Sequence, residues 1–502
     1  MVPAPTQDLP EWLHQRARLS PERPAILYQA DCLRFADLDR LVTDTAGGLA
    51  AAGVSAGDRV ALLARNGMDF VRVLYAAARL GALVVPLHAR WTTGELAATF
   101  RDCGAELLAH DDASATTAAT VVNPLPTTRG VRISTLAERG SAAEGGASPA
   151  QELNRISLYA AHSIVYTSGT SGTPKGTVLT FGNHFWNAVG SALNLGLRED
   201  DRWLACLPLY HVGGLAILLR SVLYGIPVIL HERFDAAAVN RDIDEKGVTI
   251  ISVVSTMLLQ MLEERKGDHR YPPSLRCVLV GGGPVPQPLL EECVRRGIPA
   301  VQTYGLTEAA SQVTTLAPQD ALRRLGSAGK PLFCTEVRIA GQDGETLAPG
   351  SSGEILVRGP TVTPGYLNRP EETEAALRGG WLHTGDVGYL DDEGYLYVRD
   401  RRDGVIISGG ENVYAAEVEA VLCLHPAVRE AGVTGVPDTR WGECVVATVS
   451  LRDGAHASEG DLIAFSRNRL APYKVPKRIR FTDTLPRNAA GKLLRRKLRE
   501  AP

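Results

Sequence analysis

An alternation of short apolar strands with helices most constrains how this chain folds. Residues 58–63 (DRVALL) are predicted to form a buried strand, residues 69–80 a helix, and residues 83–86 (LVVP) a second strand. Two strands that are joined by a crossover helix pair in parallel within one sheet. We therefore predict an α/β fold with a parallel sheet near the start of the chain.

The alternation extends to about residue 320 and predicts a mixed α/β region. Further helices are predicted at residues 9–19, 34–51, 92–103, 185–195 and 214–223. Further strands are predicted at residues 106–109, 203–207, 228–230, 250–254, 278–280 and 300–303. Two segments rich in Ala, Ser, Thr and Gly, 112–121 and 138–152, are predicted to be exposed loops that flank a weak strand.

The pattern changes at residue 326. Gly- and Asp-rich turns separate short strands, and these predict a small β-subdomain at residues 337–339, 353–357, 388–390 and 395–398. A basic, Gly-rich link at 400–414 follows, and then helices and strands at 416–424, 431–436, 444–450, 459–471 and 479–482. We divide the chain into an N-terminal domain (1–399), a hinge (400–404) and an α+β C-terminal domain (405–502) of roughly ordinary small-domain size.

The composition excludes several classes of protein. With 502 residues the chain exceeds the size at which one core stops growing, and its formal net charge of −3 argues against a nucleic-acid partner. No apolar run reaches the ~18 residues of a membrane span, and the N-terminus lacks the basic-then-apolar order of a signal peptide. The eight cysteines form no C-x-x-C pair, so a disulfide framework or zinc site is not expected. A cytoplasmic enzyme is the expectation, and a homo-oligomer is left open.

A Gly- and hydroxyl-rich loop is the first candidate site. Residues 167–176 (TSGTSGTPKG) follow the short apolar strand 164–166. Glycine lets backbone N–H groups turn toward a ligand, hydroxyls add donors and Lys175 adds a positive charge, so the loop suits a polyphosphate. It is not a Walker A loop, because Gly176 follows the lysine. The alternative is a flexible surface turn.

Three more motifs lie near predicted strand ends, where open α/β sheets hold ligands. His211 follows Leu-Pro-Leu-Tyr, with a core-edge histidine as the alternative. Glu308 ends QTYGLTE and could hold Mg²⁺ beside a phosphate, or cap a following helix. Asp386 in HTGD could accept both hydroxyls of a ribose, although turn aspartates are common.

The C-terminal tail carries the last candidate. Lys492 follows a glycine in PRNAAGK and precedes the helical segment LLRRKLRE. The glycine turn could aim this cation into a cleft. A solvated basic end and a nucleic-acid patch are the alternatives.

Taken in order, these motifs resemble those of the adenylate-forming superfamily, which contains acyl-CoA synthetases, luciferase-like enzymes and peptide-synthetase adenylation domains. The resemblance covers almost the whole chain and rests on TSGTSGTPKG, the histidine after LPLY, YGLTE, TGD, DRRDGVIISGGENVYAAEVE and PRNAAGK. It implies a large N-terminal domain of mixed α/β sheets plus a β-subdomain, and a small mobile C-terminal domain. It also implies two steps: a carboxylate attacks the α-phosphate of ATP, and a thiol, usually of coenzyme A, then displaces AMP.

The resemblance assigns roles to residues of this chain. Lys492, Lys175, Glu308 and His211 would be catalytic, and Glu308 with Thr167 would place Mg²⁺. The remaining ATP-binding residues would be Ser168, Gly169, Thr170, Ser171, Gly172, Thr173, Gly282, Gly283, Thr303, Tyr304, Gly305, Thr307, Asp386 and Arg401. The hinge and coenzyme A residues would be Asp403, Ser408, Gly409, Gly410 and Glu411. Gly404 and Ala415 depart from the aspartate and proline common in the family, and could loosen the hinge.

The variable middle of the chain indicates which carboxylic acid the enzyme would activate. Segments 181–197, 211–225, 232–235, 302–316 and 325–332 resemble the 2-succinylbenzoate–CoA ligase branch, which acts on an aromatic dicarboxylate in menaquinone biosynthesis. Arg220, in an apolar helix, would meet the second carboxylate, because an unpaired buried charge is costly. Ser311 and Gln312 would face the acyl site, as would His211. The alternative for Arg220 is a salt bridge to Glu232. The alternatives for the whole chain are another aryl- or medium-chain acyl-CoA synthetase, an amino-acid adenylating enzyme, and a non-catalytic adenylate-binding protein.

Overall fold

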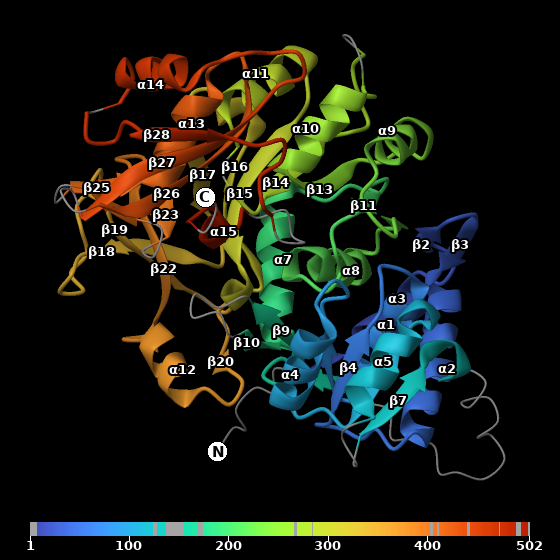
Figure 1. Cartoon of the computed structure of the whole chain (residues 1–502). Helices are drawn as coiled ribbons and strands as arrows, with labels where there is room; N and C mark the ends of the chain where they lie inside the picture. Colours follow the sequence, from blue (N-terminus) through green and yellow to red (C-terminus); the bar gives the residue numbers. More distant parts are fainter. Residues whose placement is uncertain are drawn as a thin grey trace.

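The computed structural model describes residues 8–123, 128–136, 155–167, 174–265, 269–283, 285–401, 405–408, 411–438, 442–470, 472–487 and 493–499. Within these residues the strands form two large sheets, a smaller C-terminal sheet and one isolated pair, β1 (Asp8–Pro10) with β8 (Arg155–Ser157). In Figure 1 the blue N-terminal elements and the orange-red C-terminal elements lie on opposite sides of the molecule.

The first sheet contains the predicted β-α-β unit. Its order is β20-β10-β9-β5-β4-β6-β7, and β4 pairs in parallel with both β5 and β6. The strands span β4 (Arg59–Leu63), β5 (Leu83–Pro86), β6 (Leu107–His110), β7 (Arg129–Arg132), β9 (Ala161–Thr167), β10 (Lys175–Thr180) and β20 (Gly365–Tyr366). The associated helices are α2 (Phe35–Ala51), α3 (Met68–Arg79) and α4 (Thr93–Cys103). The predicted parallel sheet is confirmed.

The second sheet continues from the α/β region into the predicted β-subdomain. Its parallel part contains β2 (Pro24–Tyr28), β11 (Trp203–Ala205), β12 (Val228–Leu230), β13 (Ile250–Val254), β14 (Cys277–Gly281) and β15 (Ala300–Leu306), with β3 (Asp31–Arg34) at the edge. The antiparallel part contains β16 (Ser311–Leu316), β17 (Ser327–Pro331), β18 (Glu336–Ala340), β19 (Gly353–Arg358), β21 (Leu377–Arg378), β22 (Trp381–Leu390) and β23 (Leu396–Arg401). The helices of this region are α7 (Phe181–Leu195), α8 (Val212–Tyr224), α9 (Ala236–Glu245), α10 (Ser255–Glu264), α11 (Gln287–Arg296) and α12 (Pro370–Ala376).

The C-terminal sheet has its own core. Its strands are β24 (Val405–Ser408), β25 (Glu411–Tyr414), β26 (Val428–Asp438), β27 (Gly442–Leu451) and β28 (Arg478–Phe481). The helices are α13 (Ala415–Cys423), α14 (Glu459–Arg467) and the short α15 (Arg495–Arg499). Val418, Val433 and Leu462 are fully buried between this sheet and its helices.

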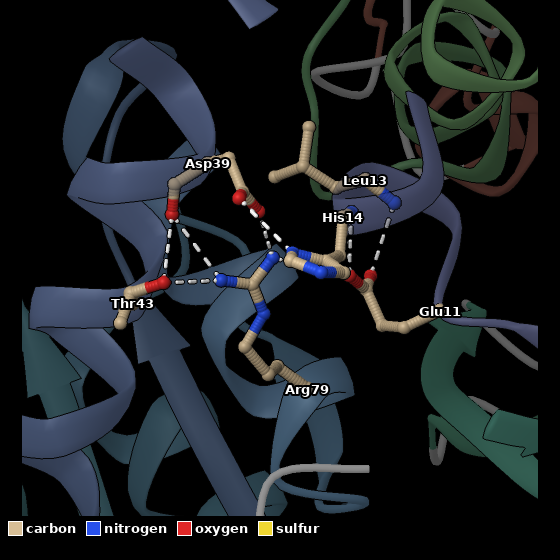
Figure 2. A network of polar contacts seen from close by, with 6 residues as sticks. All are labelled: Glu11, Leu13, His14, Asp39, Thr43 and Arg79. Atoms are coloured by element: carbon tan, nitrogen blue, oxygen red, sulfur yellow. Dashed lines mark hydrogen bonds and ion pairs between the residues drawn. The ribbon is translucent and has the colours of Figure 1, made fainter. Parts of the chain in front are cut away.

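A buried arginine fixes the N-terminal helix α1 (Trp12–Leu19) to the first sheet's helices, as Figure 2 shows. Arg79 of α3 is 2% exposed; its Nη2 donates to Glu11 Oε2 over 3.0 Å and also contacts Asp39 of α2. Glu11 in turn accepts from the backbone N–H groups of Leu13 and His14, which caps α1. This network is therefore structural.

One sequence prediction is wrong, and a second segment contains strands that were not predicted. The segment predicted as a loop at 112–121 contains helix α5 (Ala115–Val122), because its alanines favour a helix and its residues Ala118 and Val121 are buried in the first sheet's core. The described part of the link at 400–414 is a β-hairpin of β24 and β25, in which Ile406 and Val413 pair and are buried. The second predicted loop, 138–152, lies outside the described residues.

Candidate active site

Strands β9 and β10 flank the predicted phosphate loop. Thr167, the last residue of β9, pairs directly with Lys175, the first residue of β10. Ser168, Gly169, Thr170, Ser171, Gly172 and Thr173 lie outside the described residues. Lys175 Nζ lies 5.6 Å from the ring centre of Tyr366, which belongs to the neighbouring strand β20. The sheet thus anchors both ends of the loop.

Tyr366 links the loop's lysine to Glu308. The Tyr366 hydroxyl donates to Glu308 Oε1 over 3.0 Å, and the backbone N–H of Thr363 donates to the Glu308 carbonyl over 2.8 Å. Glu308 lies in a single 3-10 turn, Thr307–Ala309, that leads into strand β16. It therefore does not cap a following helix. The structure places both Lys175 and Glu308 next to Tyr366, a residue that sequence reasoning missed.

The turn after Glu308 is strained. Ala310 has φ 55° and Ser311 has φ 123°, which are values that non-glycine residues rarely adopt. Gly305 permits this turn, because a Cβ there would lie 1.8 Å from the carbonyl oxygen of Ser311. Backbone strain of this kind persists only where the surroundings hold it, and it is concentrated at functional sites.

The predicted ribose and adenine residues also approach one another. The Tyr304 hydroxyl donates to Asp386 Oδ2 over 2.7 Å, and Asp386 is 7% exposed. Asp386 lies inside β22 and pairs with Arg401 of β23, so it is not a turn residue ahead of a strand. Gly282 and Gly283 directly follow β14, the strand next to Tyr304's strand β15.

His211 and a second histidine lie at the start of α8. His211 is the N-cap residue of α8, and its Nε2 is buried without a hydrogen-bond partner in the described structure. The His88 ring, which sequence reasoning missed, lies edge to face with it at 5.5 Å. Burial lowers the pKa of each imidazole to about 4, so both rings are neutral near pH 7.

Arg220 is buried on α8 without an acidic partner. It is 2% exposed, and its Nη2 donates to Asn187 Oδ1 of α7 over 2.6 Å. No carboxylate pairs with it in the part of the chain that the structure describes. Glu232 instead accepts from Tyr28 and Gln29. The alternative salt bridge is therefore not formed. Nothing in the sequence marks Asn187 as its partner.

The other predicted acyl residues lie on β16. Ser311 is in the strained turn, and Gln312 is 2% exposed with its Nε2 3.5 Å from Thr303 Oγ1. Gln312 Oε1 has no hydrogen-bond partner among the described residues. Gln312 is therefore a buried polar group that is only partly satisfied.

A cavity of about 470 Å³ is lined both by the end of a strand of the second sheet and by the C-terminal unit. Gly281, Gly282 and Gly283 line one side of it, and Ala416 and Glu419 of α13 line the other. Ser408, in the β24–β25 hairpin, is 3% exposed. Asp403, Gly404, Gly409, Gly410 and Lys492 lie outside the described residues, as do the side chains of Arg401 and Glu411.

The site suits a magnesium ion that is shared with a phosphate. Within the described residues, no three His, Cys, Asp or Glu side chains gather into a metal cage. A magnesium site needs fewer protein ligands, because Mg²⁺ is commonly bound by one or two carboxylates together with substrate phosphates and water. Glu308, with one carboxylate oxygen held by Tyr366, fits this requirement. Thr167, the predicted second ligand, lies at the end of β9 and pairs with Lys175. No helix in the described parts of the chain is long and apolar enough to cross a membrane.

Known proteins share this organisation. The 2-succinylbenzoate–CoA ligase of Geobacillus kaustophilus is 50% identical over 98% of this chain and 97% of its own length. The o-succinylbenzoate CoA synthetase of Bacillus subtilis, solved with its acyl-adenylate intermediate, is 44% identical with a TM-score of 0.91 and 99% coverage of both chains. The same enzyme solved with ATP and magnesium ion has a TM-score of 0.90 at 44% identity, covering 98% of this chain and 99% of that one.

Family models agree with these relatives. Residues 13–367 match the model of the AMP-binding enzymes, and residues 417–492 match that of the AMP-binding enzyme C-terminal domain. The two matches lie on the large α/β region and on the C-terminal unit with its own core. The chain therefore belongs to the AMP-binding enzymes, the adenylate-forming superfamily that its motifs resemble.

Proposed function

We propose that this enzyme is an acid–thiol ligase that converts 2-succinylbenzoate, ATP and coenzyme A into 2-succinylbenzoyl-CoA, AMP and diphosphate, a step of menaquinone biosynthesis. The observation that carries the choice of acid is Arg220, a buried cation with no carboxylate partner in the described structure. The full-length similarity to ligases named for this acid supports the same choice.

The first step brings two anions together. The substrate carboxylate attacks the α-phosphorus, and diphosphate leaves, so positive charge and N–H donors must stabilise the developing negative charge. Lys175 and the 167–173 loop would hold the β- and γ-phosphates, and Lys492 would bridge the carboxylate and the α-phosphate. Glu308 and Thr167 would hold Mg²⁺, which neutralises phosphate charge when it is bound.

Tyr366 would orient the Glu308 carboxylate, because the Tyr366 hydroxyl donates a hydrogen bond to Glu308 Oε1.

The nucleoside would lie beside Tyr304. Asp386 would accept hydrogen bonds from the ribose hydroxyls together with Arg401, while Gly282 and Gly283 would lie against the adenine. The Tyr304–Asp386 hydrogen bond of 2.7 Å supports this assignment, because it fixes the carboxylate at the hydroxyl end of the Tyr304 ring. The nucleotide would also contact Thr303 and Gly305 of strand β15 and Thr307 of the turn that follows it.

The second step would use a different domain arrangement. The C-terminal domain, residues 405–502, would rotate about the hinge near Asp403, withdraw Lys492 and present Ser408, Gly409, Gly410 and Glu411 to the thioester site. The coenzyme A thiolate would attack the acyl carbon and AMP would leave. The interdomain cavity supports such a rearrangement, because it leaves space between α13 and the large sheet.

Arg220 would select the acid. An acid with two carboxylates has one that reacts and one that must be bound, and a buried guanidinium without an acidic partner supplies that binding site. Gln312 and Ser311 would line the same acyl site, and neutral His211 would line the acyl and thiol pockets. Another aryl- or medium-chain acyl-CoA synthetase is the second candidate.

The test is diphosphate release across a panel of carboxylic acids, with and without coenzyme A. We expect 2-succinylbenzoate to give the highest kcat/KM, and thioester to form only when coenzyme A is present. A panel that responds to other aryl or medium-chain acids but is silent with 2-succinylbenzoate would refute the choice of acid. A panel that is silent with every acid would refute the activity.

A further inference from the structure

We propose that Asn187 is a positioning residue for acid recognition: it holds the Arg220 guanidinium in place without neutralising it, and ties it to the turn that follows Glu308. This inference rests on the proposed function, in which Arg220 meets the carboxylate that does not react. Asn187 lies on α7, within the segment 181–197, and is not one of the site residues predicted from the sequence.

Both polar atoms of the Asn187 amide take part in this arrangement. Its Oδ1 accepts from Arg220 Nη2 over 2.6 Å. Its Nδ2 donates to the carbonyl oxygens of Ala309 over 3.2 Å and Gln312 over 3.0 Å. Because both carbonyls can only accept and the guanidinium can only donate, the amide has one workable orientation. At 1% exposure, Asn187 has little access to water in place of any of these partners.

The two carbonyls lie on either side of the strained turn. Ala310 and Ser311, with φ values of 55° and 123°, stand between Ala309 and Gln312. A conformation that non-glycine residues disfavour persists when its surroundings hold it, and Asn187 supplies two of the bonds that do so. The turn begins directly after Glu308. Asn187 therefore connects the arginine that would bind one end of the acid to the segment that would hold the metal at the other.

The neutral amide also explains how Arg220 stays available to an anion. A carboxylate at position 187 would form a buried ion pair with Arg220 and satisfy its charge. Asparagine instead satisfies one N–H group and leaves the charge unpaired, and Arg220 Nε has no hydrogen-bond partner among the described residues. Burial lowers the pKa of Arg220 from its usual value, which is the cost of holding a cation in this way.

The same helix offers a matched control. Asn183, one turn earlier on α7, donates from Nδ2 to the carbonyls of Pro360 over 2.9 Å and Val362 over 2.8 Å. Its Oδ1 accepts from the backbone N–H of Thr180 over 2.9 Å. In each asparagine, Nδ2 donates to two backbone carbonyls and Oδ1 accepts one hydrogen bond, but only at Asn187 is the donor an arginine. Asn→Asp places a carboxylate opposite two carbonyls at both positions. An effect that is seen only at position 187 therefore comes from the change next to Arg220.

The experiment measures ATP–diphosphate exchange with two acids. One is 2-succinylbenzoate; the other is 4-oxo-4-phenylbutanoate, which has the same side chain but lacks the ring carboxylate. We expect Asn187→Asp to raise KM for 2-succinylbenzoate about tenfold or more, because a charge-assisted hydrogen bond is lost, while KM for the monocarboxylate stays within about twofold. Asn183→Asp should leave the ratio of the two KM values at the wild-type value.

Arg220→Met, measured in parallel, distinguishes the two ways of failing. If Arg220→Met does not change the ratio of KM values, the recognition of the second carboxylate by Arg220 is refuted, and the role of Asn187 with it. If Arg220→Met changes the ratio but Asn187→Asp does not, the role of Asn187 alone is refuted. Should Asn187→Asp not fold, Asn187→Ala provides the same comparison: a KM rise confined to 2-succinylbenzoate supports positioning, and equal rises with both acids overturn it.

Discussion

Replacing Arg220 by methionine should abolish selectivity while sparing the fold. Methionine is uncharged and about as long as the apolar stem of arginine, so the change removes the guanidinium and keeps most of the apolar packing. A charge-assisted hydrogen bond to a substrate carboxylate is worth about 1.5–3 kcal/mol, and each 1.4 kcal/mol is about a factor of ten. We expect kcat/KM for 2-succinylbenzoate to fall about 10- to 150-fold, with little change for 4-oxo-4-phenylbutanoate.

The expected effect on stability follows from the partners of Arg220. Removing the guanidinium leaves Asn187 Oδ1 without its donor, which costs about 1–3 kcal/mol. It also removes a buried charge that has no counter-ion in the described structure, and that gain offsets the loss. We therefore expect the thermal unfolding transition of Arg220→Met to remain close to that of the wild type.

Arg79→Met is the matched control, because Arg79 is also 2% exposed but is paired with Glu11 and Asp39. Its removal leaves carboxylates uncompensated in the interior, so about 3–5 kcal/mol of stability should be lost without a change in acid selectivity. Differential scanning calorimetry and diphosphate-release kinetics measure the two effects separately. Equal losses of kcat/KM on both acids in Arg220→Met, or a selectivity change in Arg79→Met, would refute the reasoning.

Four further predictions follow from the site. Tyr366→Phe should lower kcat about 2- to 10-fold and raise the magnesium concentration needed for half-maximal diphosphate release, because the metal-holding glutamate loses its hydroxyl donor; an unchanged magnesium titration would contradict this. Gly305→Ala should unfold the turn or inactivate the enzyme, since its Cβ would lie 1.8 Å from Ser311 O, and wild-type activity and melting would show that the strand can move. Burial lowers the pKa of His162 to about 4, so the unfolded chain binds the extra proton between about pH 6.5 and 4 and stability falls as pH decreases through that window. His162→Phe should weaken this pH dependence in thermal melts at pH 5 and 7, and an identical slope would argue against the assignment. Gly404→Asp should change the rate of thioester formation from a preformed acyl-adenylate, measured by rapid quench; unchanged rates in both half-reactions would count against a loosened hinge.

Much of the fold was predictable because its signals are local. Strand β5 lies at the predicted residues, 83–86, and the strand-helix-strand unit around it forms the expected parallel sheet. The loop predicted at 112–121 is wrong: the Ala- and Thr-rich composition suggested a loop, but Ala118 and Val121 lie on a buried helix face. No strand was predicted at 400–414, where glycines obscured the β-branched residues of a hairpin.

The candidate site was predictable as a set of motifs but not as a geometry. His211, Glu308, Asp386 and Lys175 were identified from residues next to one another in the sequence. Tyr366, which lies between Lys175 and Glu308, belongs to no motif, and it is 58 residues from Glu308. Its position depends on the pairing of β20 with β10, and strand pairing between distant segments has no local signature.

The sequence by itself determined the chemistry and the family, because ordered motifs depend on residue type and spacing alone. Only the tertiary structure decided which charges remain unpaired. Arg220 was predicted to meet either an anionic substrate or Glu232, and the fold sends Glu232 to Tyr28 and Gln29 instead. It also places the neutral Asn187 beside the guanidinium, 33 residues earlier in the chain. The packing of α7 against α8 determines which side chain lies next to Arg220, because the direction of a buried side chain depends on which helix faces meet.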